Sequence, residues 1–234
     1  MRVAGIVLLM AAPSHLACKA PPDYGAFLDH HPASILVLPP LNETADVNAA
    51  DAFLSTVSTA LAECGYYVFP IAVVDRMMKE NGRPTPGEMH RVPLEKIQEV
   101  FGADAVLFVV IKTWTTQYLV FDTSTTVRLE YRLVDVDTGT ELWRQERTFT
   151  RSSSSGAPDP VSAILVALVT AVVSAVSAPE WGLATRANRA TFEDAGFGLL
   201  RGPRHPEFES HRRRKLAERK PPGDHAPPRA SNHH

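Results

Sequence analysis

Few residues of the chain have the types and the spacing of a metal site. Asp135, Asp137 and Gly139 partly match a calcium-binding loop. The glycine of such a loop stands at the sixth position, whereas here it stands at the fifth, so a hairpin turn is the simpler interpretation. The histidine pairs at 30–31 and 233–234 lie in segments expected to be flexible, where adjacent histidines rarely fix the geometry of a metal. We therefore expect neither a metal nor a cofactor.

The chain also lacks the sequence patterns of a nucleophilic enzyme. The serine run at 152–155 is not part of a G-x-S-x-G motif, which in hydrolases exposes the serine on a sharp turn. No glycine-rich phosphate-binding loop is present in the sequence. Cys64 lies on the apolar face of a predicted helix, where a buried, unreactive thiol is expected; an exposed Cys64 could instead form an intermolecular disulfide. The sequence predicts no catalytic residue and a protein that is not an enzyme.

The strongest chemical signal is a cysteine close to the start of the chain. A short basic start precedes an apolar run at 3–12, which is typical of a secretory signal peptide and too short to span a bilayer. The residues before Cys18 are similar to the lipobox of bacterial lipoproteins, although His15 stands where leucine is usual. The resemblance implies that residues 1–17 are removed and that Cys18 is acylated. The alternative is a plain secretory signal with Cys18 as an ordinary thiol.

An acylated Cys18 would bind membrane lipid and anchor the chain. Lys19 is not the aspartate that retains many lipoproteins in the inner membrane. We therefore expect the outer membrane, with the folded domain facing the periplasm or the cell surface. Residues 18–33 contain three prolines and are predicted to form a lipidated tether.

The composition excludes several classes of protein. Hydrophobic residues make up 44% and charged residues 21% of the 234 residues, as in a globular protein with a sizeable core. The formal net charge of -2 lacks the basic excess of a dedicated nucleic-acid binder, so no nucleic-acid partner is expected. Two cysteines cannot build a multi-disulfide scaffold.

Residues 34–151 are predicted to form an α+β core domain. The expected order is strand, helix, strand, helix, helix, strand and an antiparallel meander, at 34–40, 50–64, 66–73, 75–81, 94–101, 103–112, 126–133 and 141–150. Asp46 is expected to cap the first helix and Gly65 to end it. The strand at 103–112 lacks alternation, which indicates burial on both faces. We expect a mixed sheet with the helices packed on one of its faces.

Residues 152–202 are predicted to form C-terminal helices. An uncharged apolar segment at 161–178 meets the lower length limit for a membrane span. A helix buried against the sheet or a partner is the simpler interpretation, and a strand pair is the other alternative. An amphipathic helix is expected at 181–195.

Residues 203–234 are predicted to form a disordered basic tail. They hold eight lysines and arginines against four acids, a net charge of +4, and too few apolar side chains to offset the entropy of ordering. The run of four basic residues at 212–215 could meet anionic lipid head groups, although a solvated tail is the simpler interpretation.

Several short strings together resemble one family. They are SILVLPPLN at 34–42, DVN at 46–48, GYYV at 65–68, FGADA at 101–105, LVD at 133–135, TG at 138–139, LW at 142–143 and GPR at 202–204. This set is similar to a family of bacterial lipoproteins of unknown function that includes a meningococcal vaccine-candidate antigen. The resemblance covers about 24–208. It implies a fold like the N-terminal domain of TolB and a role as an auxiliary lipoprotein of an envelope transport system, and it supplies no catalytic residue.

Two groups of residues are candidates for binding a partner. The first is the corner after the opening strand, which consists of Pro39, Pro40, Leu41 and Asn42. Ligands of α/β sheets gather beyond strand ends and at helix N-termini, although this corner could equally be a rigid turn needed only for folding. The second is the aromatic pair Tyr66 and Tyr67, of which one could contact a partner, although packing at a sheet edge is the simpler role.

Three functions remain in competition. The favoured one is a non-catalytic, lipid-anchored module of the cell envelope, which binds an envelope protein such as a transporter. The second is a structural component that forms a homo-oligomer through the segment at 161–178. The third, an envelope hydrolase, is the weakest because the sequence offers no set of nucleophile, base and orienting residue.

Overall fold

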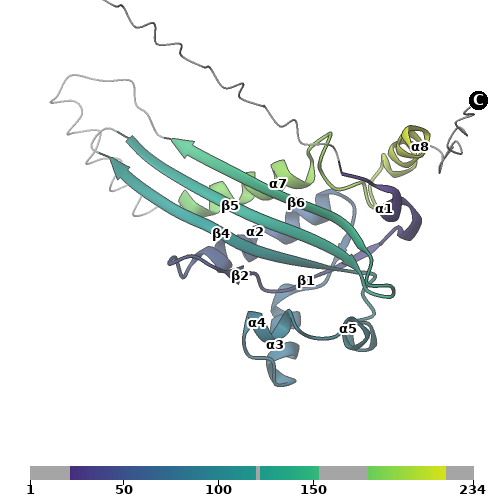
Figure 1. Ribbon diagram of the computed structural model, residues 1–234, viewed down its shortest axis with the longest axis horizontal. Helices are drawn as coiled ribbons and strands as arrows, with labels where there is room; N and C mark the ends of the chain where they lie inside the picture. The colour runs from purple at the N-terminus through teal and green to yellow at the C-terminus, as the bar shows by residue number, and fades with distance from the viewer. Residues whose placement is uncertain (1–21, 120–121, 153–178, 220–234) are drawn as a thin grey trace, which may run out of the picture.

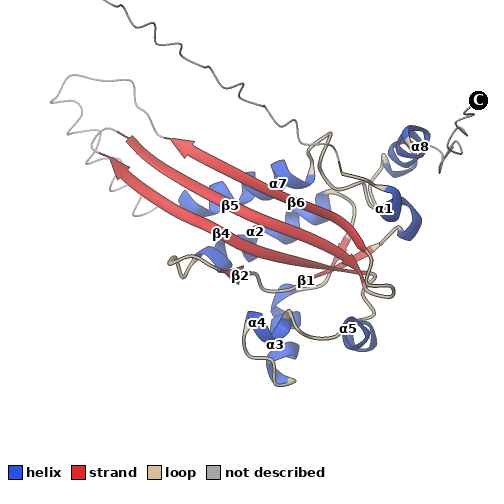
Figure 2. Ribbon diagram, viewed as in Figure 1, coloured by secondary structure: helices blue, strands red, loops and turns tan. Residues whose placement is uncertain are grey.

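The computed structural model describes residues 22–119, 122–152 and 179–219. These residues form an α+β fold with a mixed sheet and packed helices, as the sequence predicts (Figure 1, Figure 2). The strands are β1 (Ser34–Val37), β2 (Leu41–Asn42), β3 (Tyr67–Val68), β4 (Ala105–Leu119), β5 (Asp122–Asp135) and β6 (Glu141–Ser152). The helices are α1 (Gly25–His30), α2 (Ala49–Glu63), α3 (Ile71–Glu80), α4 (Pro86–Met89), α5 (Leu94–Phe101), α7 (Pro179–Phe192) and α8 (Phe208–Glu218).

The sheet is parallel on one side and antiparallel on the other. Its strands lie in the order β3-β1-β4-β5-β6, and β2 pairs with β4 beyond the end of β1. β1 is parallel to both β3 and β4, whereas β4, β5 and β6 form the predicted antiparallel meander. Gly139 at φ 71° closes the tight turn between β5 and β6. The turn confirms the hairpin interpretation of the segment at 135–139.

Helices cover both faces of the sheet, so the prediction of a single covered face is wrong. Ile35 and Leu107 point into a cluster shared with α2 and α7. Leu36 and Val106, their neighbours in the chain, point into a second cluster with α3, α4 and α5. Successive side chains of a strand alternate between faces. An apolar run without alternation therefore requires cover on both sides.

Helix α2 ends at the predicted stop signal, whereas its N-cap is a different residue from the one predicted. Asp46 accepts a hydrogen bond from the backbone N–H of Asn48 at 2.9 Å, so it stabilises the turn before the helix instead of the first helical turn. Asn48 is the N-cap residue. Gly65 follows the helix with φ 92°, the left-handed conformation that glycine adopts at helix ends.

The second predicted strand is shorter than expected, and the helix after it begins earlier. The sequence predicts a strand over 66–73 and a helix that begins at Asp75. In the structure β3 ends at Val68, and Pro70 is the N-cap of α3. Proline has no N–H to donate to a sheet but fits the start of a helix, where that N–H would have no partner. The expected strand is therefore cut at Pro70.

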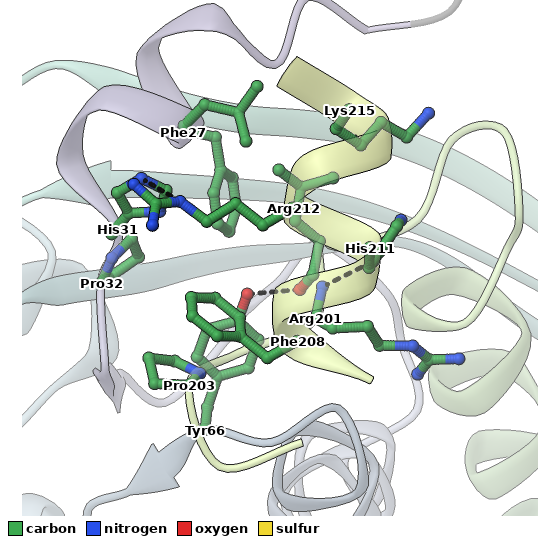
Figure 3. A pocket seen from close by; sticks show the side chains of 12 residues that line it. Phe27, His31, Pro32, Tyr66, Arg201, Pro203, Phe208, His211, Arg212 and Lys215 are labelled. Atoms are coloured by element: carbon green, nitrogen blue, oxygen red, sulfur yellow. Dashed lines mark hydrogen bonds between the residues drawn. The ribbon is translucent and has the colours of Figure 1, made fainter. Parts of the chain in front are cut away.

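Helices α1 and α8 correct two boundaries predicted from the sequence. α1 lies within the predicted tether at 18–33, and its Phe27 and Leu28 are buried in the core. α8 lies within the predicted disordered tail at 203–234, next to α1 (Figure 1, Figure 3). Arg219 at the end of α8 forms a bidentate ion pair with Asp29 of α1, at 2.7 and 3.0 Å. Contacts between distant parts of the chain thus order both segments.

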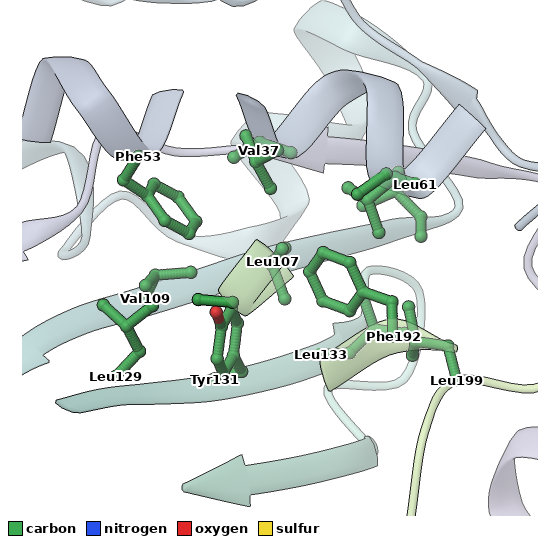
Figure 4. Packing of buried hydrophobic residues seen from close by; sticks show 14 of the residues in the cluster. Val37, Phe53, Leu61, Leu107, Val109, Leu129, Tyr131, Leu133, Phe192 and Leu199 are labelled. Carbon is green, nitrogen blue, oxygen red and sulfur yellow. The ribbon is translucent and has the colours of Figure 1, made fainter. Parts of the chain in front are cut away.

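The main core lies between the sheet and the helix pair α2–α7 (Figure 4). Tyr131 of β5 is fully buried there, and its hydroxyl donates to Asn188 Oδ1 of α7 at 2.9 Å. Asn188 Nδ2 donates in turn to Thr56 Oγ1 of α2 at 2.9 Å. Thr56 Oγ1 donates to the Phe53 carbonyl at 3.0 Å. This chain of bonds satisfies the polar groups that burial would otherwise leave without partners.

Two sequence predictions lie outside the described residues. They are the signal peptide with the acylated Cys18 and the apolar segment at 161–178. Among the residues that are described, no helix is both long and apolar enough to cross a membrane.

Candidate functional site

The edge strand β3 carries an exposed aromatic side chain with a cation above it. Tyr67 is 43% exposed, and its ring lies edge-on to Phe69 with 5.1 Å between ring centroids. The guanidinium of Arg204 lies 5.2 Å from the centroid of the Tyr67 ring. Arg204 forms no ion pair within the described part of the chain. We refer to Tyr67, Phe69 and Arg204 as the β3-edge cluster.

A close crossing of two backbones places Arg204 beside Tyr67. The Gly202 N–H donates to the Cys64 carbonyl at 2.8 Å, and the Arg204 N–H donates to the Gly65 carbonyl at 3.1 Å. A Cβ on Gly202 would lie 2.6 Å from the Gly65 carbonyl oxygen, and a Cβ on Gly65 would lie 2.5 Å from the His205 nitrogen. Only glycine fits this approach, which explains the GY and GPR strings at 65–66 and 202–204.

Tyr66 has a different environment from its neighbour. Its side chain is buried, and its hydroxyl donates to the Leu200 carbonyl. Burial raises the pKa of the Tyr66 phenol well above its usual value. Of the two predicted aromatic candidates, Tyr67 is therefore the one accessible to a partner, and Tyr66 holds the C-terminal segment against the core.

The predicted corner at 39–42 is partly buried. The side chains of Pro39 and Pro40 are buried, and the Pro39 carbonyl lies 2.8 Å from Nε2 of His90. Leu41 is half-buried, and Asn42 is exposed. The Asn42 side chain donates to the Asp46 carbonyl at 2.7 Å and accepts from the Thr44 backbone and hydroxyl. These contacts lie within the loop and match the rigid-turn alternative, and only Leu41 and Asn42 offer side-chain surface.

The two predicted groups of residues lie at opposite ends of β1. Tyr67 pairs with Ser34 at the start of β1. The corner follows Val37 at its end, where Leu41 pairs with Val110 of β4. The structure does not bring them into one site.

Sequence reasoning missed two of the three residues in the β3-edge cluster. Phe69 lies in the predicted strand at 66–73, where the sequence assigns it no function. Arg204 appears only as part of the family string GPR at 202–204. The spacing Tyr67-x-Phe69 places two aromatic side chains on one face of an extended segment, which was an available signal. The contact with Arg204 joins residues 137 positions apart, and no local pattern indicates it.

A small pocket lies behind the edge, between α1, the segment at 200–203 and α8 (Figure 3). Its space of about 290 Å³ includes open solvent at the mouth of the pocket. Its lining is apolar and basic, without an acidic residue, and consists of Phe27, Leu28, His31, Pro32, Tyr66, Leu200, Arg201, Pro203, Phe208, His211, Arg212 and Lys215. Arg212 Nε donates to His31 Nε2 at 3.1 Å across it.

Several buried polar groups among the described residues take part in structural contacts. Asp135 accepts from the backbone and hydroxyl of Thr138, at 2.9 and 2.7 Å, and its other oxygen lies 3.1 Å from His30 Nδ1 of α1. Burial raises the pKa of the Cys64 thiol to about 11, which keeps it protonated and unreactive. Within the described ranges no group of three or more acidic, histidine or cysteine side chains is arranged to hold a metal ion.

Comparison with known proteins gives a family match over most of the chain. The family described as "Putative lipoprotein GNA1162-like" matches residues 22–204. A Neisseria meningitidis serogroup B protein (strain ATCC BAA-335 / MC58), described as "Putative lipoprotein NMB1124/NMB1162", is 35% identical over 207 residues. The match covers 88% of this chain and 96% of the relative.

Two solved structures are among those similar to the chain. The crystal structure of lipoprotein GNA1162 from Neisseria meningitidis is 40% identical, with a TM-score of 0.50, and the match covers 62% of this chain and 99% of that one. A PelC dodecamer from Paraburkholderia phytofirmans is 17% identical, with a TM-score of 0.41, and the match covers 73% and 93%. The family predicted from the sequence strings is confirmed, and the likeness to the N-terminal domain of TolB stays a prediction.

Proposed function

This chain belongs to the family of GNA1162-like lipoproteins, and from that premise we propose that it is a lipid-anchored binding module of the bacterial envelope. In this proposal acyl chains on Cys18 hold the protein at the outer membrane, and the folded domain binds an envelope protein, such as a component of a transport system. The module catalyses no reaction. Two or more acyl chains would give stable anchoring, because each buried methylene contributes about 0.8 kcal/mol.

The β3-edge cluster is the observation that supports a protein partner. Tyrosine and arginine are enriched among the residues that dominate binding energy at protein interfaces. β3 is also the last strand on its side of the described sheet, and an edge strand can pair with an added strand. The exposed ring of Tyr67, with Arg204 stacked on it, therefore offers an aromatic and cationic contact at the last strand on this side of the described sheet.

The non-catalytic part of the proposal is supported by how the buried polar groups are used. Tyr131, Asn188 and Thr56 bond one another, and Asp135 holds the turn after β5. Each of these groups bonds to a structural partner, and it would have to give up that bond to act in catalysis. Substrate turnover that a single side-chain change abolishes would contradict this part.

Site-specific crosslinking in cells tests the partner surface. A photo-reactive residue in place of Tyr67 should give a discrete adduct with one envelope protein, and Arg204→Glu should weaken that adduct. The matched control is Val47, which is 82% exposed in the loop before α2. The same adducts from both positions would contradict the proposed surface, and an adduct with a second copy of the chain would make it an oligomer contact.

The anchor is tested separately from the surface. Cys18→Ser should abolish metabolic labelling with a radioactive fatty acid and should move the protein from the membrane fraction to the soluble fraction. Unchanged labelling and fractionation in this variant would show that Cys18 is not the acylation site.

A further inference from the structure

Basic side chains gather in the last described part of the chain. Residues 200–219 contain seven lysines and arginines and three glutamates, a net charge of +4. Because the whole chain has a net charge of -2, all other residues together carry -6. The positive charge of this protein is therefore concentrated around α8.

The outward face of α8 carries two arginines that make no close ion pair with a described carboxylate. Arg213 and Arg214 are exposed, and neither forms an ion pair within the described residues. Arg213 Nε donates to the Glu209 carbonyl of its own helix at 3.2 Å, which leaves its charge uncompensated. Leu216 on the same helix is 41% exposed.

α8 is fixed to the body of the protein through α1 (Figure 3). The ion pair between Arg219 and Asp29 holds one end of the helix. Phe208 at the other end lies edge-on to His31, with 6.4 Å between ring centroids. Lys215 Nζ lies 5.3 Å from the Tyr24 ring centroid. The outward cations of α8 thus have a defined direction relative to α1.

The attachment to α1 places α8 close to the predicted anchor. Gly25, the first residue of α1, is seven positions after Cys18 in the chain. A chain of this length spans at most about 25 Å. α1 and α8 lie together at one end of the molecule (Figure 1). A bilayer that holds the acyl chains of Cys18 would therefore lie within a short distance of Arg213 and Arg214.

The histidines at α8 and α1 contribute little to the positive charge of this surface. The pKa of His31 is lowered from its usual value, first by burial and then by the charge of Arg212. The pKa of His211 is lowered by burial and then by Arg214, Lys215 and Arg201. Both histidines are therefore mostly neutral near pH 7, and the positive charge of this surface comes from arginine and lysine, which stay charged.

We propose that α8 lies against anionic phospholipid head groups of the membrane that anchors the chain, with Arg213 and Arg214 as its main contacts. The inference rests on the proposed acylation of Cys18, which brings the bilayer to this end of the molecule. Basic side chains near an anionic bilayer surface are attracted to it over about one Debye length. The contact would orient the domain, so that the β3-edge cluster is presented in a fixed direction to a partner.

Vesicle binding by the mature chain without its acyl group tests this proposal. The protein begins at residue 18 with Cys18→Ser and retains every described helix and strand. It should bind vesicles that contain about one third phosphatidylglycerol at least tenfold more tightly than vesicles of phosphatidylcholine alone, and added salt should weaken the binding. R213E/R214E should reduce binding to the anionic vesicles at least tenfold, and R213Q/R214Q should reduce it less.

The matched control is R83E/R91E. This variant changes the net charge by the same amount as R213E/R214E. It replaces two exposed arginines beside α4 that form no ion pair within the described residues. Its binding should stay within about twofold of the parent protein, and thermal unfolding should show that all variants are folded. Equal binding to both kinds of vesicle, or equal losses in R83E/R91E and R213E/R214E, would overturn the proposal and favour an acidic protein as the partner of α8. Fatty-acid labelling of the unmodified chain reports separately on the proposed anchor.

Discussion

At the scale of single residues, the Gly65–Gly202 crossing determines where the C-terminal segment lies. Gly202→Ala would place a Cβ 2.6 Å from the Gly65 carbonyl oxygen, so one backbone must move and weaken the hydrogen bonds beside it. Overpacking of this kind costs about 1–3 kcal/mol. We expect the free energy of unfolding, measured by urea denaturation, to fall by that amount.

The control for this substitution is Gly182→Ala in α7. A Cβ on Gly182 would meet nothing within 4 Å, and alanine favours a helix over glycine by about 1 kcal/mol. The control should therefore be neutral or slightly stabilising. A Gly202→Ala protein as stable as the parent would show that the crossing is looser than the structure indicates.

At the scale of elements, the buried hydrogen bonds between β5, α7 and α2 hold the helix pair on the sheet. Asn188→Leu would leave the fully buried Tyr131 hydroxyl without its acceptor. An unsatisfied buried donor costs about 1–3 kcal/mol, and the branched side chain of the introduced leucine adds a packing cost. We expect a loss of about 2–4 kcal/mol in the free energy of unfolding.

A second substitution separates the hydrogen bond from the packing. Adding Tyr131→Phe to Asn188→Leu removes the orphaned hydroxyl, so the double variant should be more stable than Asn188→Leu alone. Arg186→Ala, at an exposed position of the same helix, should change stability by less than about 0.5 kcal/mol. A double variant less stable than Asn188→Leu would contradict the assigned role of the bond.

Elements with strong local patterns could be predicted from the sequence, and elements that depend on distant partners could not. The apolar run of β4, the alternation in β5 and the stripe of α2 each indicate the element that forms. α1 has six residues, too few to be stable alone, and α8 has almost no apolar face. Both form through contacts with distant parts of the chain: Phe27 and Leu28 of α1 are buried in the core, and Arg219 at the end of α8 pairs with Asp29, 190 positions away.

The residues of the candidate site also divide into those that a local pattern predicts and those that depend on distant contacts. Tyr67 could be predicted because a strand with a tyrosine at an expected sheet edge is visible in the sequence. The separation of Tyr66 and Tyr67 to opposite environments follows from the alternation of a strand, but which of the two is buried depends on Leu200. The position of Arg204 depends on the contact between Gly65 and Gly202, which no local pattern shows.

At the scale of the whole molecule, three histidines make stability depend on pH in the same direction. Burial is the largest cause of a lowered pKa at His31, His90 and His211. In the unfolded chain a histidine has a pKa of about 6.5. Below that pH the unfolded state takes up protons that the folded state does not, so the free energy of unfolding falls as the pH falls. Above it, the full contribution of these histidines is present.

We expect the free energy of unfolding to be constant from about pH 8 to 7 and to decrease below about pH 6.5. Each histidine contributes a slope of up to about 1.4 kcal/mol per pH unit. His90→Gln should reduce the slope, since glutamine can still donate to the Pro39 carbonyl that His90 Nε2 contacts at 2.8 Å but takes up no proton. Urea denaturation between about pH 7.5 and 5.5 measures this, well above the range where carboxylates titrate. A parent protein with constant stability over that range would contradict the prediction. A His90→Gln protein with an unchanged slope would contradict it as well, because His90 would then take up protons equally in the folded and unfolded states.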